Sequence, residues 1–217
     1  MAPLRVIGGL AALALIASLT GCAGTPDGTH AGTLRADGVQ ARTVELQEAP
    51  ALDDVVDAAR ELGLATLGLA EREGNVVLSP ASLATALALL AEGARGTSQS
   101  ALEHVLGAPG ADRRDAFAAL RVALAELDGD PAAATADELP ERPIVHLADQ
   151  VVVDDGFEVR GEFLAALAET FDAGAQTAEL GSEAGMGVLS EWIRRHTGGL
   201  IQETAIQPDD RLRVVLQ

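Results

Sequence analysis

The sequence predicts an α+β domain in which amphipathic helices pack against a β-sheet. Between residues 52 and 201, apolar residues recur at intervals of three and four in several segments, which is the spacing of a helix with one buried face. Two other segments, 144–153 and 211–217, are rich in β-branched residues, which is typical of buried strands. With 217 residues, the chain is long enough to form one domain with a sizeable core.

The composition limits both the core and the partners of this protein. Aromatic residues make up only 2% of the chain, so the core has to be built mainly from Leu, Val and Ala. The formal net charge is −18, and an acidic surface repels the phosphate backbone of nucleic acids. We therefore expect no nucleic-acid partner. The acidity either keeps the protein soluble or steers a basic partner, and the sequence leaves both interpretations open.

The N-terminal segment has the pattern of an export signal. Arg5 precedes an apolar stretch, Val6 to Leu19, which is shorter than the roughly 20 residues of a membrane-spanning helix and has the length of a signal-peptide core. The residues that follow complete the sequence Leu-Thr-Gly-Cys, which resembles a bacterial lipobox and predicts lipidation of Cys22, the only cysteine. An ordinary secretory signal with a cysteine there by chance is the alternative.

These features divide the chain into three parts. We expect a signal peptide over residues 1–21, a flexible tether over 22–50 and a folded domain over 51–217. The tether prediction rests on a composition rich in Gly, Thr, Asp and Ala without clean periodicity. The protein is expected to be exported, and either anchored to the cell membrane through Cys22 or extracellular.

The first predicted helix starts at Leu52. Its apolar face is formed by Val55, Ala58, Leu62, Ala65 and Leu69. Gly63 and Gly68 weaken an isolated helix by about 1 kcal/mol each relative to Ala. We therefore expect packing, rather than intrinsic propensity, to hold this helix.

The next segment predicts a strand, a capped helix, a turn and a second helix. A short apolar run, Val76 to Leu78, leads into Ser79, a preferred N-cap residue, and Pro80, which suits the first helical position. An apolar stripe of Leu83, Ala86, Leu87 and Leu90 follows, and Gly93 is placed for a C-cap. A turn over 96–98 then starts a short helix that ends at Gly107.

The remaining pattern alternates helices with strands. Residues 112–127 predict an amphipathic helix, and 128–143, rich in Ala, Asp and Pro, predict an exposed loop. The strand at 144–153 ends in a turn and is followed by a helix whose face carries Phe163, Leu167 and Phe171. A helix over 184–201 and the strand at 211–217 complete the pattern.

No catalytic or metal-binding motif is present. The sequence contains no G-x-S-x-G, no H-E-x-x-H and no phosphate-binding loop. The four histidines are scattered, and we interpret His146 as a strand residue with a hydrogen-bonding neighbour rather than a metal ligand. We therefore expect neither an enzyme nor a protein that requires a cofactor or a metal.

Several spaced motifs resemble the serpin family. They are N-x-x-x-S-P-x-S from residue 75, then A-L-x-L-L-x-x-G-A-x-G-x-T, then L-x-x-V-L, and T-x-G-x-I after the helix that starts near residue 184. The resemblance covers about residues 51–217 in continuous order. It implies a fold in which N-terminal helices pack against part of a large central β-sheet.

The resemblance also implies roles for particular residues. Asn75, Ser79, Pro80 and Ser82 match the region under the central sheet that is called the shutter, although capping and turn chemistry alone also account for them. The helix over 184–201 matches the one that crosses the front of the sheet, and we single out three of its residues: Ser190, Trp192 and Thr197.

Some positions depart from the family pattern. Ser190 and Asp149 stand where the family favours Asn, and Leu200 stands where Lys is usual. The change at Ser190 bears on how the crossing helix is tied to the sheet, because the family's Asn helps to make that connection.

The function that the resemblance implies is inhibition of a serine or cysteine protease. A complete serpin offers a reactive loop near its C-terminus, and after cleavage the loop inserts into the central sheet together with the trapped protease. The resemblance here stops inside a strand, so we expect a fragment or split gene that lacks this loop and is non-inhibitory alone. A non-inhibitory binding lipoprotein on the same scaffold and an inert gene remnant are the alternatives.

Overall fold

The computed structural model describes residues 32–70, 74–138 and 140–217. The predicted signal peptide and the lipidation site Cys22 lie outside the described residues. Within these three ranges, no helix combines the length and the apolar character that crossing a membrane requires.

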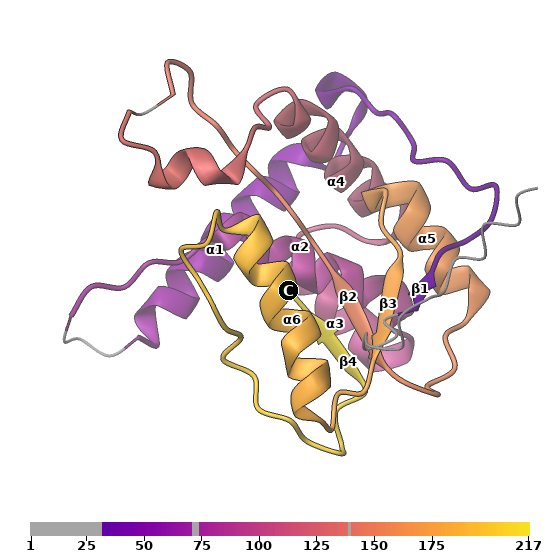
Figure 1. Cartoon of the computed structure of the whole chain (residues 1–217). Coiled ribbons are helices and arrows are strands. Elements are labelled where there is room, and N and C mark those ends of the chain that lie inside the picture. Colours follow the sequence, from indigo (N-terminus) through magenta and orange to yellow (C-terminus); the bar gives the residue numbers. More distant parts are fainter. Residues whose placement is uncertain (1–31, 71–73, 139) are drawn as a thin grey trace, which may run out of the picture.

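The described residues form helices around a small sheet (Figure 1). The helices are α1 (Leu52–Gly68), α2 (Pro80–Gly93), α3 (Gly96–Val105), α4 (Gly110–Ala125), α5 (Gly161–Phe171), α6 (Glu183–His196) and the short 3-10 helices η1 (Leu46–Glu48) and η2 (Pro131–Thr135). The strands are β1 (Thr33–Leu34), β2 (Val151–Asp154), β3 (Ala175–Ala178) and β4 (Val214–Leu216). The predicted α+β class is confirmed.

The sheet has the strand order β1-β3-β2-β4. β2 runs parallel to β3, which it reaches through α5, and antiparallel to β4. Val152 is paired with Gln176 on one side and with Val215 on the other. β2 is therefore an interior strand, and β4 is an edge strand among the described residues.

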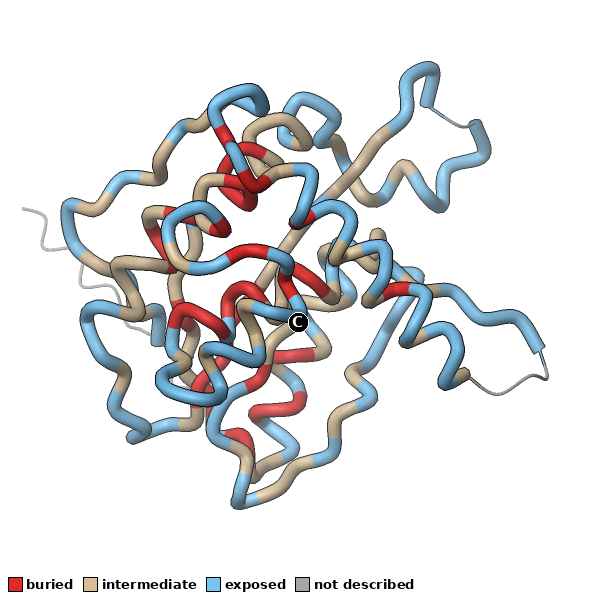
Figure 2. Tube along the Cα trace, turned by 180° about the vertical axis from the view of Figure 1, so that it is seen from behind, coloured by how far each residue is buried: buried red, intermediate tan, exposed pale blue. Residues whose placement is uncertain are grey.

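Both faces of the sheet are covered by helices. Val151 and Val153 point to one face, where they pack with Leu89 of α2 and Leu167 of α5. Val152 points to the opposite face, where α6 packs. Figure 1 shows α6 in front of β2 and β4 with α2 behind them, and Figure 2 shows the buried residues gathered between these layers. A strand that is buried on both faces requires the continuous apolar run that this sequence provides.

Three predicted elements differ from the structure. Residues 76–78 do not form a strand, and Val77 is 96% exposed, because no described strand lies beside them to share hydrogen bonds. Within 144–153, only the last three residues belong to a strand, since the preceding ones extend past the end of the sheet. The last long helix ends at His196 rather than at residue 201, because Gly198 and Gly199 adopt positive φ angles.

The described part of the predicted tether, residues 32–50, lies against the domain. β1 pairs antiparallel with β3 and thereby covers that edge of the sheet. The Arg42 guanidinium donates to Asp115 of α4 and, at 2.6 Å, to Glu169 of α5. A single arginine therefore joins this segment to two helices at once.

A buried ion cluster joins α2 to α4. The Glu92 carboxylate, whose side chain is 0% exposed, accepts hydrogen bonds from Arg113 at 2.7 Å and from Arg114 at 2.8 Å. The Arg113 side chain is only 3% exposed, and its Nε and Nη1 atoms have no hydrogen-bond partner. Charges in such surroundings depend on one another, because neither can be hydrated.

Glu92→Ala is expected to lower the free energy of unfolding by about 3 kcal/mol, since it leaves the buried Arg113 with only the more distant Glu103, 3.8 Å from its Nη1, as a counter-charge. The double change Glu92→Met with Arg113→Met should lose less, because it removes both buried charges. Urea unfolding measures both effects. Glu191→Ala, which removes an exposed ion pair on α6, serves as the control and should cost no more than about 1 kcal/mol. Equal losses for Glu92→Ala and Glu191→Ala would contradict the role given to the cluster.

Candidate functional site

The candidate site is the sheet together with the two helices that lie on its opposite faces, α6 and α2. α6 starts where the Ser182 hydroxyl accepts a hydrogen bond from the backbone N–H of Gly185 at 3.1 Å. At this point the helix lies so close to the Glu179 carbonyl that a Cβ on Gly185 would collide with it. The helix ends in two basic residues, Arg194 and Arg195, and their positive charges interact favourably with the negative C-terminal end of the helix dipole.

The contact between α6 and the sheet is apolar. Met186 and Leu189 of the helix pack on Val152 of β2 and Val215 of β4, and all four are buried. Contacts of this type are non-directional and depend on the apolar area removed from water. They hold the helix on the sheet, and the Gln217 side chain adds one directional contact by donating to the Leu189 carbonyl at 3.4 Å.

Directional bonds connect α6 to the chain that follows it. The Ser190 hydroxyl accepts from the backbone N–H of Thr204 at 3.1 Å, and the Thr197 hydroxyl accepts from the N–H of Ile201 at 3.1 Å. Ser190 therefore binds the connection between α6 and β4, and the described contacts do not link it directly to a strand. This partner lies 14 residues away, so the sequence pattern alone carried no signal for it.

A row of polar and aromatic side chains joins the end of α6 to the segment before β2. His146 Nδ1 lies 2.7 Å from Asp128 Oδ1, and His146 Nε2 lies 2.9 Å from His196 Nδ1. Trp192 lies one turn earlier on α6, and the centroid of its ring is 4.5 Å from the centroid of the His196 ring. The predicted hydrogen-bonding neighbour of His146 is present, but the prediction that His146 lies in a strand is wrong, because β2 starts only at Val151. Its pairing with His196 was not predicted, because the two are 50 residues apart.

These contacts affect the titration of two groups in the row. Burial lowers the pKa of His196, and the positive charges of His146 and Arg195 add to the effect. The pKa of Asp128 is also lowered, chiefly by the hydrogen bond from His146 and further by one from the backbone of Gly129. Asp128 therefore stays ionised in the range where the imidazoles take up protons.

On the other face, α2 begins with the predicted cap. The Ser79 hydroxyl accepts from the Ser82 backbone N–H at 3.2 Å and lies 2.8 Å from the Ser82 hydroxyl, with Pro80 at the first helical position. Ser79, Ser82 and Asn75 are all exposed in the described structure. The capping chemistry is confirmed, and the shutter role stays a prediction.

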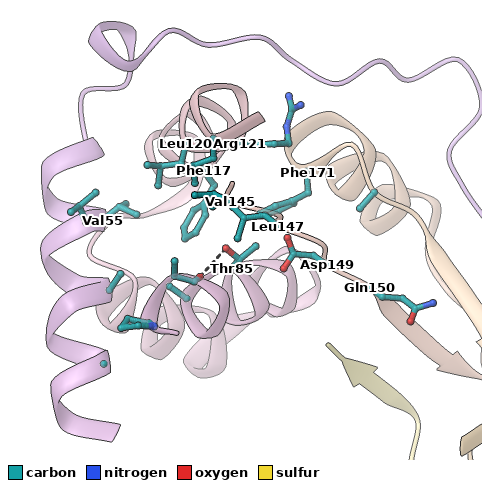
Figure 3. Close-up of a pocket in the computed structure, with 18 of the residues that line it drawn as sticks. Val55, Thr85, Phe117, Leu120, Arg121, Val145, Leu147, Asp149, Gln150 and Phe171 are labelled. Carbon is teal, nitrogen blue, oxygen red and sulfur yellow. Dashed lines mark hydrogen bonds between the residues drawn. The ribbon is translucent and has the colours of Figure 1, made fainter. Parts of the chain in front are cut away.

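A cavity of about 1120 Å³ opens beside α2. It lies between α1, α2, α4 and the extended segment before β2, and Figure 3 shows Val145, Leu147 and Phe117 directed into it. Asp149 lies on its wall, where burial raises the pKa of the carboxyl to about 6. The cavity is therefore mainly apolar, with an acidic group that is costly to ionise.

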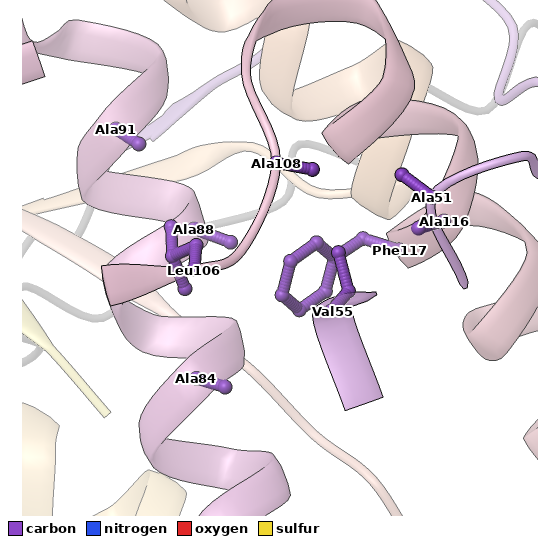
Figure 4. Close-up of a cluster of buried hydrophobic side chains, with 9 residues drawn as sticks. All are labelled: Ala51, Val55, Ala84, Ala88, Ala91, Leu106, Ala108, Ala116 and Phe117. Carbon is purple, nitrogen blue, oxygen red and sulfur yellow. The ribbon is translucent and has the colours of Figure 1, made fainter. Parts of the chain in front are cut away.

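The cavity borders a hydrophobic core made largely of alanine, with which it shares Val55, Ala84 and Phe117. Figure 4 shows Phe117 as the one aromatic ring among small side chains from α1, α2 and α4 and the loop after α3. The buried members of this cluster are Ala51, Val55, Ala84, Ala88, Ala91, Leu106, Ala108, Ala116 and Phe117. Small side chains let these helices approach closely, as expected from a chain with few aromatic residues.

Comparisons with known proteins agree on one family. A family model described as serpin (serine protease inhibitor) matches residues 62–216. Among curated proteins, neuroserpin from Mus musculus is 26% identical over 137 residues, covering 63% of this chain and 31% of the relative. Serpin-ZXA from Oryza sativa subsp. japonica is 35% identical over 137 residues, covering 59% of this chain and 31% of the relative. The chain thus spans about a third of the length of these curated relatives.

Solved structures share the fold. The thermophilic serpin tengpin in its native state superposes with a TM-score of 0.65 at 21% identity, covering 86% of this chain and 45% of tengpin. Arabidopsis AtSerpin1 in its native stressed conformation gives a TM-score of 0.59 at 21% identity and covers 81% and 43% of the two chains. At this identity, the similarity establishes the fold of the described residues.

Asp149→Asn is expected to stabilise the protein at about pH 8 by up to about 3 kcal/mol, because burial raises the pKa of Asp149 from 3.8 to about 6. Above pH 6 the folded state carries a charge that burial disfavours. As the pH falls toward 3.8, the folded wild type takes up the proton before the unfolded chain does, so its disadvantage disappears.

Urea unfolding at a series of pH values measures the difference between Asp149→Asn and the wild type. Asp137→Asn, in the exposed loop after α4, is the control and should change stability by no more than about 0.5 kcal/mol at any pH. A pH-independent effect of Asp149→Asn would show that the buried charge is not its cause.

Proposed function

The chain belongs to the serpin family, and we propose that it supplies the N-terminal part of the sheet scaffold of a serine-type endopeptidase inhibitor. In this proposal the complete protein inhibits a serine or cysteine protease by cleavage and insertion of its reactive loop. The chain described here contributes part of the frame that receives the loop.

The observation that supports this proposal is the arrangement of β4 as an edge strand. β4 pairs with β2 on one side, and its other side has no strand partner among residues 32–70, 74–138 and 140–217. An unpaired edge presents a row of N–H and C=O groups that another strand can bind. Strand addition of this kind is the established behaviour of serpin reactive loops.

The register identifies the atoms that face this edge. Gln150 and Gln217 exchange backbone hydrogen bonds of 2.6 and 3.0 Å, so they form a hydrogen-bonded pair between β2 and β4. Pairs alternate along an antiparallel ladder, which places the N–H groups of Val214 and Leu216 on the side away from β2. An incoming strand would therefore bind at these two residues.

The site residues take supporting roles in this proposal. The cap formed by Ser79 and Ser82 holds the start of the helix under the sheet, and Ser190, Trp192 and Thr197 keep the crossing helix in place on its front. None of them acts as a catalyst. Export, with attachment to the membrane through a lipid at Cys22, completes the proposal and rests on the sequence pattern alone.

The complete protein, including its reactive loop, is expected to form an SDS-stable complex with a serine protease. Val214→Pro should shift the outcome from this complex toward cleaved, free inhibitor, because proline removes the N–H that faces the open edge and leaves the bonds to β2 in place. Val214→Thr keeps the shape and the N–H and is the matched control. Gel electrophoresis after incubation with a panel of trypsin-like, chymotrypsin-like and elastase-like proteases measures both products.

Two results would contradict the proposed function. If every protease either ignores the wild type or cleaves it without a stable complex, the scaffold is non-inhibitory. If Val214→Pro and Val214→Thr give the same yield of complex, the open edge of β4 does not receive the loop.

A further inference from the structure

The row Asp128–His146–His196–Trp192 connects parts of the chain that are distant in sequence. Asp128 follows α4, His146 precedes β2, and His196 and Trp192 lie on the last turns of α6. The two imidazole rings are 5.2 Å apart between centroids and only 6° from parallel, while their facing nitrogens are 2.9 Å apart. The two rings therefore meet end to end through one hydrogen bond.

The facing nitrogens have room for one hydrogen atom only. Asp128 accepts from His146 Nδ1–H, so in the neutral pair His146 Nε2 accepts from His196 Nδ1–H. After one proton is added, one of the two nitrogens is still an acceptor and the bond remains. After a second proton is added, both nitrogens carry hydrogen, the bond is lost and two cations face each other at close range.

The end of α6 has little freedom to adjust around this bond. Gly198, at φ +59°, approaches the Pro131 carbonyl so closely that a Cβ would collide with it. On the other side, the backbone N–H of Val145 donates to the Leu127 carbonyl at 3.0 Å, which holds the segments before and after the loop together. Repulsion between the two imidazoles therefore favours separation of α6 from this segment.

We propose that the row is an acid-sensitive fastener, which holds the C-terminal end of α6 to the segment before β2 near neutral pH and releases it when both imidazoles are protonated. The fastener is built from this chain alone. Its test therefore needs neither a protease nor the reactive loop, and its failure is separate from failure of the proposed function.

Charged groups of both signs surround the two imidazoles. The Asp128 carboxylate accepts a hydrogen bond from His146 and places a negative charge beside it. Arg195 on α6 adds a positive charge near the pair, and both Arg194 and Arg195 are paired with Glu191 on the same helix. Because the pKa of His196 is lowered by burial and by the positive charges of His146 and Arg195, the released state binds the second proton more readily than the fastened state. Attachment is therefore complete above the ordinary histidine pKa of about 6.5 and is lost as the pH falls below it.

Trp192 provides the readout, because it is the only tryptophan and its ring lies 4.5 Å from that of His196. The purified chain is titrated from about pH 8 to about pH 4.5 while tryptophan fluorescence is recorded. Hydrogen exchange over residues 190–200 is followed at the same pH values and corrected for its intrinsic pH dependence. We expect a fluorescence transition below about pH 6.5, together with at least ~10-fold faster exchange at the end of α6.

Three variants distinguish the fastener from a general acid effect. His146→Gln removes one of the two charges and should abolish the pH dependence of exchange at the end of α6. Asp128→Asn keeps an acceptor for His146 but removes the negative charge, so release should move to lower pH. His104→Gln, on the exposed surface of α3, should leave both readouts unchanged.

The result that overturns the proposal is exchange over 190–200 that is equal at about pH 7.5 and about pH 5 in the wild type. An unshifted release midpoint in Asp128→Asn would overturn it as well, even if His146→Gln fails to fold. A purely structural contact would lower stability in these variants without moving a pH midpoint.

Discussion

Burial of β2 on both faces is the constraint on which the rest of the structure depends. Val151, Val152 and Val153 are all 0–1% exposed, so each face of this short strand needs a helical cover. α2 and α5 supply one cover and α6 supplies the other. Burying one valine side chain contributes about 1.5–3 kcal/mol to the free energy of folding relative to leaving it exposed. Because the three valines point to both faces of the strand, a helical layer on each face is needed to bury them all. The arrangement also explains why α6 lies across the sheet, since Val152 and Val215 would otherwise form an open apolar surface.

The layer behind the sheet is held differently, because its core is made mainly of alanine. Alanine side chains allow close approach of helices but bury little apolar area per residue. The Glu92–Arg113–Arg114 cluster joins α2 to α4 within this layer. A buried ion pair is weak evidence for net stability, but it specifies one arrangement, since any slip of the helices would leave a charge unpaired. Apolar packing thus stabilises the sheet, and charge pairing fixes which surfaces of α2 and α4 meet.

The sequence was informative where the determining interactions are local. The cap at Ser79, Pro80 at the start of α2 and the valine run of β2 all follow from neighbouring residues. Three features could not be predicted in this way. Val76 to Leu78 has strand composition, but a strand also requires a partner, and the described residues supply none. Arg42 looked like part of a flexible tether because its two acidic partners are 73 and 127 residues away. The pairing of His146 with His196 likewise depends on how α6 is laid over the sheet.

The two kinds of contact made by α6 have different consequences for its movement. Its contact with the sheet is mainly apolar and therefore non-directional, with one long hydrogen bond of 3.4 Å from Gln217 Nε2 to the Leu189 carbonyl. Directional bonds hold α6 at Ser182, whose hydroxyl donates to the Glu179 carbonyl at 2.9 Å, at Ser190 in the middle of the helix and at His196 at its C-terminal end. Hydrogen bonds weaken steeply when the geometry changes, so these few atoms determine where the helix sits. The position of α6 over the sheet therefore depends on these few directional bonds more than on the larger apolar area that the helix buries.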